Sequence, residues 1–217
     1  ARPEIQINQP DNFGWTPLNI TCKHGHVNIV NILLARDDVQ INQARDDGCT
    51  PLHVACWNSH SNIVNALLQS IAIQVNQPAK GGWTPLFLAC EIGHMNAINA
   101  LLARNEIQIN QAVNDGATPL HIACLHGHVN AINALLARNE SQINQTTNNG
   151  STPLHMACEN DHVNAINALL AQGTIQVNKR DTYGYTSLLL ACKMGHVNTI
   201  NALLADGAIQ INQAMDN

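Results

Sequence analysis

Aromatic and charged side chains are both scarce in this chain. Phe, Trp and Tyr make up 3% of its 217 residues, and Asp, Glu, Lys and Arg together make up 12%. The ten lysines and arginines are scattered, and the formal net charge is −5. A nucleic-acid site requires a face rich in lysine and arginine, so nothing in the composition predicts DNA or RNA as a partner.

Long apolar runs are missing as well. No run approaches the 18 or so residues that a membrane-spanning helix needs, and no segment has the pattern of a secretory signal. Hydrophobic residues nevertheless account for 45% of the chain, which is enough to build a long continuous core. We therefore expect no membrane partner.

A repeat of 34 residues, present six times without insertion or deletion, is the main feature of the chain. A period of this length indicates a stack of similar units, each packed on its neighbours, so function is expected on the surface of the stack. A glycine, one variable residue and a threonine open each unit. The threonines are Thr16, Thr50, Thr84, Thr118, Thr152 and Thr186. The repeats are placed at 11–44, 45–78, 79–112, 113–146, 147–180 and 181–214.

Each unit has the signals of two short helices and an arm. Threonine followed by proline, as in Thr118-Pro119, predicts a capped helix start. This first helix ends at a glycine in four copies, and at Ser59 or Asp161 in the other two. A second helix is predicted over 129–137, and the alternating segment 107–111 predicts a hairpin-like arm. The chain is thus predicted to be an all-α repeat solenoid of helix-turn-helix units joined by β-hairpin-like arms.

These units resemble ankyrin repeats. The matching strings are Thr50-Pro51-Leu52-His53, Thr118-Pro119-Leu120-His121 and Thr152-Pro153-Leu154-His155, and Gly-His and Leu-Leu pairs follow at the family's positions. The resemblance covers essentially the whole chain. It implies a single ankyrin-repeat domain over 1–217 that binds a protein or peptide in a concave groove. The chain departs from the family pattern in two ways. Its period is 34 residues, where the family usually has 33. The histidine after Thr-Pro-Leu is replaced by Asn19, Phe87 and Leu189 in three copies, where its hydrogen bond is not expected.

Six of the seven cysteines recur at one helix position. They are Cys22, Cys56, Cys90, Cys124, Cys158 and Cys192. Equivalent residues of stacked units lie roughly 10 Å apart, beyond the reach of a disulfide. We therefore expect buried free thiols and a reducing, cytoplasmic environment. Cys49 lies in an arm and is expected to be an exposed thiol.

Histidine and cysteine also occur together, as in Cys22-Lys23-His24-Gly25-His26, and this resembles a set of metal ligands. A histidine equivalent to His26 recurs in all six copies, however, which favours a structural role in the turn. Cysteine, histidine and asparagine are also the components of a thiol protease, but a catalytic site needs one asymmetric arrangement rather than six equivalent ones. Since no phosphate-binding loop or paired acidic motif is present either, we expect no enzyme activity, metal, cofactor or small-molecule substrate.

Asparagines form two recurrent sets. Asn8, Asn42, Asn76, Asn110, Asn144, Asn178 and Asn212 lie in the arms, where a short amide can hydrogen-bond the turn backbone. The family resemblance implies that these arm asparagines can be substrates of an asparaginyl hydroxylase. The second set, exemplified by Asn130 and Asn133, lies on the second helix and either forms amide ladders between units or reflects biased codon usage.

Six of the seven aromatic residues are expected, from the family resemblance, to face the groove, and Phe87 alone replaces a recurrent histidine. This distribution is typical of an interface with aromatic anchors, although packing between neighbouring arms is an alternative. We predict that Phe13 lies at the N-terminal end of a groove in the first three units, with a second anchor in unit six. The predicted partner-binding residues are Phe13, Trp15, Lys23, Asp46, Asp47, Trp57, Lys80, Trp83, Glu91, Leu125, Tyr183 and Tyr185.

The predicted function is that of a protein-protein interaction scaffold. The alternative is a regulatory or targeting segment of a larger enzyme, for example a secreted bacterial effector acting in the host cytosol. The chain begins and ends within arms, at 5–8 and 209–213, which predicts that it is part of a longer protein.

Overall fold

The computed structural model describes residues 5–205, which contain twelve helices arranged as six pairs. The predicted arm at 209–213, with Asn212, lies outside the described residues. The chain divides into two compact units, 1–108 and 109–217. The first contains α1 (Pro17–Lys23), α2 (Val27–Leu34), α3 (Pro51–Trp57), α4 (Ser61–Leu68), α5 (Pro85–Glu91) and α6 (Met95–Leu102). The second contains α7 (Pro119–Leu125), α8 (Val129–Leu136), α9 (Pro153–Glu159), α10 (Val163–Leu170), α11 (Ser187–Met194) and α12 (Val197–Ala205).

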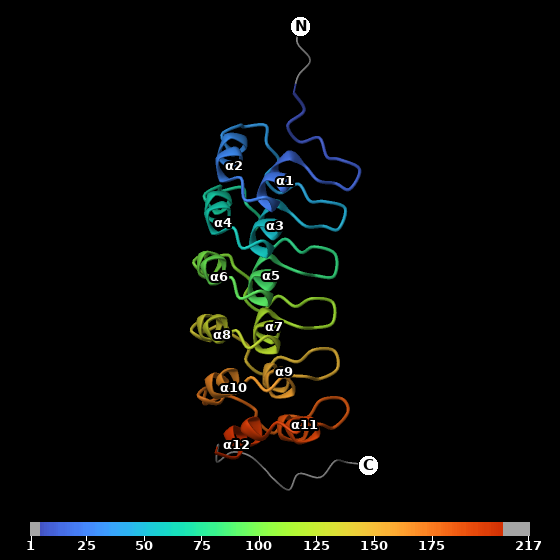
Figure 1. Ribbon diagram of the computed structural model, residues 1–217, viewed down its shortest axis with the longest axis vertical. Coiled ribbons are helices and arrows are strands. Elements are labelled where there is room, and N and C mark those ends of the chain that lie inside the picture. Colours follow the sequence, from blue (N-terminus) through green and yellow to red (C-terminus); the bar gives the residue numbers. More distant parts are fainter. Residues whose placement is uncertain (1–4, 206–217) are drawn as a thin grey trace. The chain divides into compact units, whose positions relative to one another are not determined.

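Each of the two compact units contains three helix pairs, which form two layers of helices and a row of turns. In the first unit α1, α3 and α5 lie side by side, α2, α4 and α6 form a second layer against them, and the long turns project from the side of the first layer (Figure 1). The second unit repeats this arrangement with α7, α9 and α11 against α8, α10 and α12. The structure therefore confirms the predicted all-α repeat fold.

Helix starts follow the prediction from Thr-Pro. In α7 the Thr118 hydroxyl oxygen accepts a hydrogen bond from the His121 N–H at 3.4 Å, and the Thr118 N–H donates to His121 Nδ1 at 3.2 Å. This reciprocal pair satisfies donors that a helix start leaves without partners. In α1 the side chain of Asn19 replaces the histidine and accepts from the Thr16 N–H at 3.3 Å. The first helix thus keeps its cap without histidine.

The first helices are followed by a residue in the left-handed region. Gly25 has φ of 73° and Gly127 has φ of 65°, while Ser59 and Asp161 adopt 58° and 56° at the same position of their repeats. The predicted termination signals are confirmed in both classes. The two non-glycine copies accept a conformation that costs a residue with a Cβ roughly 1–2 kcal/mol.

The arms differ from the prediction of extended, strand-like segments, since no strand forms within residues 5–205. A tight turn remains at each tip: the Arg45 N–H donates to the Cys49 carbonyl at 3.0 Å, and the Gly48 N–H donates to the Arg45 carbonyl at 2.9 Å. Neighbouring tips are joined by the bond from the Lys80 N–H to the Asp47 carbonyl, at 2.9 Å. One such bond between tips is too few to form a ladder, which explains why no sheet develops.

The arm asparagines join consecutive repeats. Asn42 Nδ2 donates to the Ala72 carbonyl at 2.7 Å, and its Oδ1 accepts from the Gln74 N–H at 2.9 Å. Their predicted role in hydrogen bonding to turns is confirmed, and the turn belongs to the following repeat. Asparagines of the second helices are exposed, and Asn96 Nδ2 donates to the Ser61 hydroxyl at 3.1 Å rather than to another amide.

Burial of the cysteines follows the prediction with one exception on the helices. Cys22, Cys56, Cys90, Cys124 and Cys158 are buried. Cys192, expected to be buried, is exposed. Within each compact unit the next first-layer helix packs on the preceding one, as α3 does on α1 and α9 does on α7, whereas no further pair follows α12 within the described residues. Cys49, expected to be exposed, is partly buried, and its thiol contacts the Asp47 side chain.

Candidate functional site

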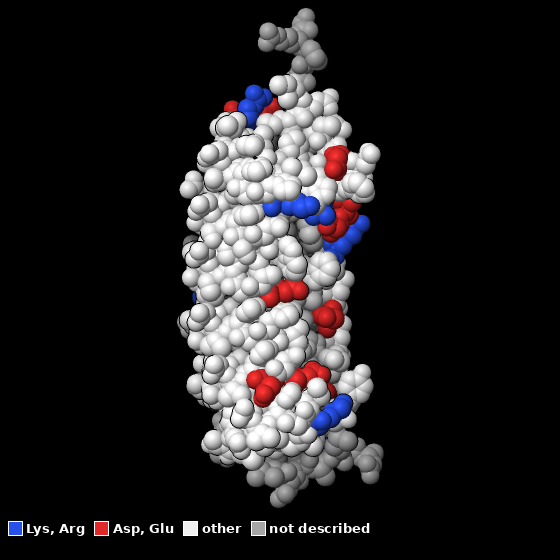
Figure 2. Space-filling model, viewed as in Figure 1, with Lys and Arg blue, Asp and Glu red and all other residues white. Residues whose placement is uncertain are grey.

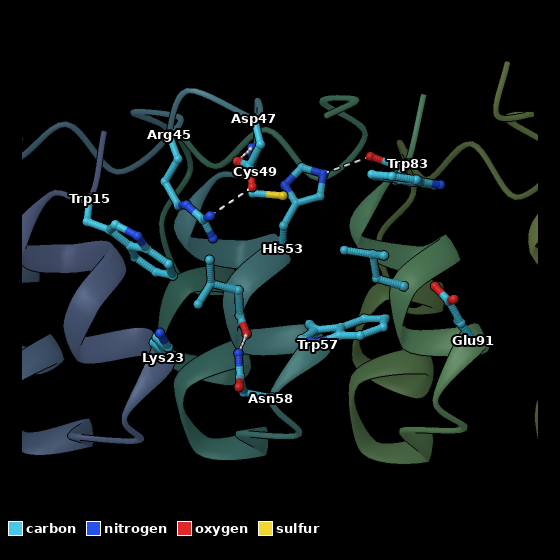
Figure 3. A pocket seen from close by; sticks show the side chains of 12 residues that line it. Trp15, Lys23, Arg45, Asp47, Cys49, His53, Trp57, Asn58, Trp83 and Glu91 are labelled. Carbon is cyan, nitrogen blue, oxygen red and sulfur yellow. Dashed lines mark hydrogen bonds and ion pairs between the residues drawn. The ribbon is translucent and has the colours of Figure 1, made fainter. Parts of the chain in front are cut away.

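The first compact unit contains a groove of about 520 Å³, which lies between the turn tips and the first helix of each repeat, α1, α3 and α5. We call it the tryptophan groove. Six of its lining residues were predicted from the sequence, namely Trp15, Lys23, Asp47, Trp57, Trp83 and Glu91. Six others were not, namely Arg45, Cys49, His53, Val54, Asn58 and Leu88. Figure 3 shows the two layers of the site, with the turn residues above the helix residues.

Trp15 is packed by side chains of its own protein. The guanidinium carbon of Arg45 lies 3.6 Å from the centre of a Trp15 ring, and Lys23 Nζ lies 4.7 Å from a ring centre. Arg45 also forms an ion pair with Asp47 at 2.9 Å. Since cation–π contacts already engage the Trp15 indole, this residue connects the first turn to the second. Trp15 therefore fits the alternative interpretation, in which an aromatic residue packs between neighbouring arms.

Trp57 and Trp83 are different, because 48% and 44% of their surfaces are exposed. Trp57 is the last residue of α3, and Trp83 directly precedes Thr84, the cap of α5. The two indoles lie on opposite sides of the groove, Trp83 with the turns and Trp57 with the helices (Figure 3). Among the residues that line the groove, these two are the large apolar side chains that remain exposed.

His53 fixes the upper wall of the groove. Its Nε2 donates to the Trp83 carbonyl at 2.9 Å, while its Nδ1 accepts from the Thr50 N–H at 3.1 Å. Both ring nitrogens of the neutral imidazole are therefore used. Burial lowers the pKa of His53 to about 4, so the ring is neutral near pH 7. These contacts give His53 a structural role in placing Trp83.

Cys49 is not arranged as a nucleophile. Burial, together with the negative charge of Asp47, raises its pKa to about 11. At neutral pH the thiol is thus protonated, whereas reactive cysteines have a lowered pKa. Its own backbone N–H donates to the Asp47 carboxylate at 3.0 Å.

Several predicted site residues lie elsewhere. Phe13 is 71% exposed and is not part of the groove lining, in contrast to its predicted place at the groove end. Asp46 and Lys80 are exposed on turns and also lie outside the lining. Their side chains occupy turn tips, which stand beyond the space between turns and helices.

Three predicted residues belong to the second unit. Tyr185 has Lys193 Nζ at 4.8 Å from its ring centre, and Tyr183 is 70% exposed. The backbone N–H groups of both tyrosines donate to the Asp181 carboxylate, at 2.9 and 2.8 Å. Leu125 ends α7 and is partly exposed. Phe87, by contrast, is buried within the first unit.

The recurrent histidines at the turns between helices act on the preceding repeat. His60 Nε2 donates to the Lys23 carbonyl at 3.1 Å, and His162 Nε2 donates to the Leu125 carbonyl at 3.0 Å. These bonds satisfy carbonyl groups at helix ends, which explains why the histidines recur. Within residues 5–205 no group of three or more His, Cys, Asp and Glu side chains is placed to hold a metal ion.

Charged side chains are few on the face shown in Figure 2, and most of that surface is uncharged. Several ion pairs are local, such as Arg36–Asp38 and Arg104–Glu106, each spanning two residues of the chain. None of the helices in the described part of the chain is long and apolar enough to cross a membrane.

Some of the residues that the prediction missed carried a detectable signal. Val54 and Leu88 lie three residues before Trp57 and Glu91, and residues at this spacing share a helix face. The orientation of Arg45 had no such signal, because it depends on the pairing with Asp47 and the stacking on Trp15.

Comparison with known proteins agrees with this architecture. A family model described as ankyrin repeats, in three copies, matches residues 3–79, 71–147 and 130–215. The crystal structure of the human ASB11 ankyrin repeat domain is similar, with a TM-score of 0.78 and 28% sequence identity over 92% of this chain and 86% of that chain. A search of curated proteins gave no match. The chain belongs to the ankyrin-repeat family.

Proposed function

We propose that this protein is an interaction scaffold that binds a partner protein or peptide in the tryptophan groove. Ankyrin repeats generally mediate protein-protein interaction. The observation that carries the proposal here is the exposure of Trp57 and Trp83 on two sides of one groove. Tryptophan is enriched among the few residues that dominate binding energies at interfaces.

The other copies of the repeat support this assignment for Trp57. The equivalent residues include Lys23, Glu91 and Leu125, so the architecture does not require an indole at this position. Half of the Trp57 surface is exposed in the absence of a partner. A large aromatic residue that packing does not require, placed in a groove, is well suited to become buried on binding.

Affinity capture followed by mass spectrometry tests the proposal when it is carried out with matched variants. The wild-type chain, Trp57→Ala and Trp83→Ala are immobilised in parallel, with Asn130→Ala on the second-helix surface as a control. Truncation of a central aromatic residue typically costs about 2 kcal/mol or more, which is roughly thirtyfold in affinity. A partner of the groove is retained by wild type and Asn130→Ala and lost with both tryptophan variants. If both tryptophan variants retain every partner, the proposal fails.

We also propose that the chain has no catalytic activity of its own. Support comes from the family, whose fold is typically a non-catalytic binding scaffold, and from the raised pKa of Cys49. The same groove would serve a regulatory or targeting segment of a larger enzyme, such as a secreted effector. Sequencing of the full-length gene separates these two roles.

A reducing compartment such as the cytosol is the proposed location. Its support is the set of free cysteines, five of which are buried on helices. Detection of the tagged protein in a fractionated cell extract tests this location.

A further inference from the structure

The charged side chains that line the tryptophan groove already have interactions within the protein. Arg45 forms an ion pair with Asp47 at 2.9 Å, and its guanidinium carbon packs 3.6 Å from a Trp15 ring centre. Lys23 Nζ lies 4.7 Å from a Trp15 ring centre. Glu91 also has an interaction within the protein. A charged group that entered the groove would therefore lose hydration without meeting an open charge of opposite sign.

Two neutral polar side chains of the groove are also hydrogen-bonded. His53 uses both ring nitrogens, Nδ1 with the Thr50 N–H at 3.1 Å and Nε2 with the Trp83 carbonyl at 2.9 Å. Asn58 Nδ2 donates to the Val54 carbonyl at 2.8 Å. These bonds hold the walls of the groove in place, so the groups that make them are not offered to a ligand.

The surface that stays open to a ligand belongs to two indoles. Trp57 and Trp83 are each nearly half exposed, and they lie on opposite sides of the groove (Figure 3). Within residues 5–205 neither indole N–H has a hydrogen-bond partner in the protein. Val54 and Leu88, which also line the groove, are apolar and buried. The groove thus offers aromatic faces and two hydrogen-bond donors.

The volume of the groove limits the length of the segment that enters it. An α-helix with its side chains is about 10–12 Å wide and rises about 5.4 Å per turn, so a groove of about 520 Å³ holds roughly one helical turn. A helical ligand normally places anchors over at least two turns. The groove therefore fits a few residues of a partner better than the face of a helix.

We propose that the tryptophan groove binds a short uncharged peptide segment, which inserts one or two large apolar side chains between Trp57 and Trp83 and presents backbone carbonyls to their indole N–H groups. This assignment rests on the proposed binding function of the groove and specifies the chemistry of its partner. Large apolar side chains bury the open indole faces and require no charge to be desolvated. Backbone carbonyls give the two indole donors the acceptors that they lack within the protein.

Selection from a random twelve-residue peptide library displayed on phage, with the immobilised wild-type chain as target, tests this chemistry. We expect the enriched peptides to share one or two large apolar residues and no charged residue. The affinity of an enriched peptide is then measured by fluorescence anisotropy. Trp57→Ala and Trp83→Ala should each weaken its binding about thirtyfold. A tenfold increase in salt should change its affinity less than about twofold, because no ion pair forms on binding.

Two matched variants test the specificity of these effects. Phe13→Ala removes an exposed aromatic residue of the same compact unit that lies outside the groove lining, and it should leave the affinity unchanged. Glu91→Gln removes a charge at the groove and should change the affinity less than about twofold, since the ligand carries no charge to pair with it. Circular dichroism and the melting temperature verify that each variant is folded.

The outcomes also separate this proposal from the proposed function. If the enriched peptides share a charged residue and lose affinity in salt, while both tryptophan variants weaken them, the groove is a binding site but its ligand is charged and this proposal is wrong. If the peptides bind both tryptophan variants as tightly as wild type, or if no peptide is enriched, this proposal is overturned, and partner capture alone decides the function of the groove.

Discussion

Replacing Gly127 with alanine perturbs the turn between α7 and α8 at a position whose cost can be worked out. Its φ of 65° lies in the left-handed region, which costs a residue with a Cβ roughly 1–2 kcal/mol. Alanine also lowers the conformational entropy of the unfolded protein, which offsets about 0.4–1 kcal/mol of that cost. An added Cβ would also lie 2.5 Å from His162 Nδ1, so the ring must shift.

That shift weakens the bond from His162 Nε2 to the Leu125 carbonyl, which is 3.0 Å long. A hydrogen bond of this kind contributes about 1 kcal/mol. Together the two effects predict that Gly127→Ala lowers the free energy of unfolding by about 2 kcal/mol. The reverse change, Ser59→Gly, removes the left-handed strain from a residue with φ of 58° and should raise it by about 0.5 kcal/mol.

Urea unfolding followed by far-UV circular dichroism measures both changes, and the midpoints are compared at equal slope. Asn130→Ala, on the exposed surface of α8, serves as the control for a substitution outside the turn. The reasoning is refuted if Gly127→Ala is as stable as wild type, or if Ser59→Gly loses as much stability as Gly127→Ala does.

Three further predictions concern pH, thiols and packing. Burial lowers the pKa of His53 and His121 to about 4, against an ordinary value near 6.5, so the unfolded chain binds more protons between these values. Each ring that stays neutral in the folded state should therefore contribute about 3 kcal/mol to the free energy of unfolding above pH 6.5, and this contribution should decline as the pH falls toward 4. A flat profile of urea midpoints between pH 7 and 4 would contradict this. In thiol titration of the native protein Cys192 should react first, because it is the exposed cysteine, and Cys192→Ser should remove the fast phase; a fast phase that persists would show that another thiol is accessible. Trp15→Ala should lower the melting temperature more than Trp57→Ala does, because Arg45 packs on the Trp15 ring, and the opposite order would show that Trp57 is the packing residue.

The sequence was sufficient for the repeat architecture because its signals are local. Each signal acts within one or two helical turns of its own position. The threonine, the proline and the residue with positive φ were all confirmed in α7. Cooperation between neighbouring repeats then follows from the period alone. The arms were predicted less well, since alternation at Ile107 and Ile109 indicated an extended arm while both side chains are buried in a turn-rich loop.

The candidate site was predictable only in part. Trp57, Trp83 and Glu91 were found because they occupy positions at which the residue varies among the repeats. Phe13 lies outside the groove lining, because a sequence pattern does not distinguish a turn tip from the wall of a groove. The contacts of Arg45 depend on side-chain geometry between two repeats, and a pattern along one chain does not contain this information.

The paired bonds of Asn42 to Ala72 and Gln74 have an evolutionary consequence. They connect positions 30 and 32 residues apart, so one inserted residue within a repeat moves the acceptor and the donor out of reach together. Duplication or loss of a complete repeat leaves the same pair intact at every new junction. Gene rearrangement can thus change the number of repeats freely while their length stays constant, which accounts for a period of 34 residues without a single insertion or deletion.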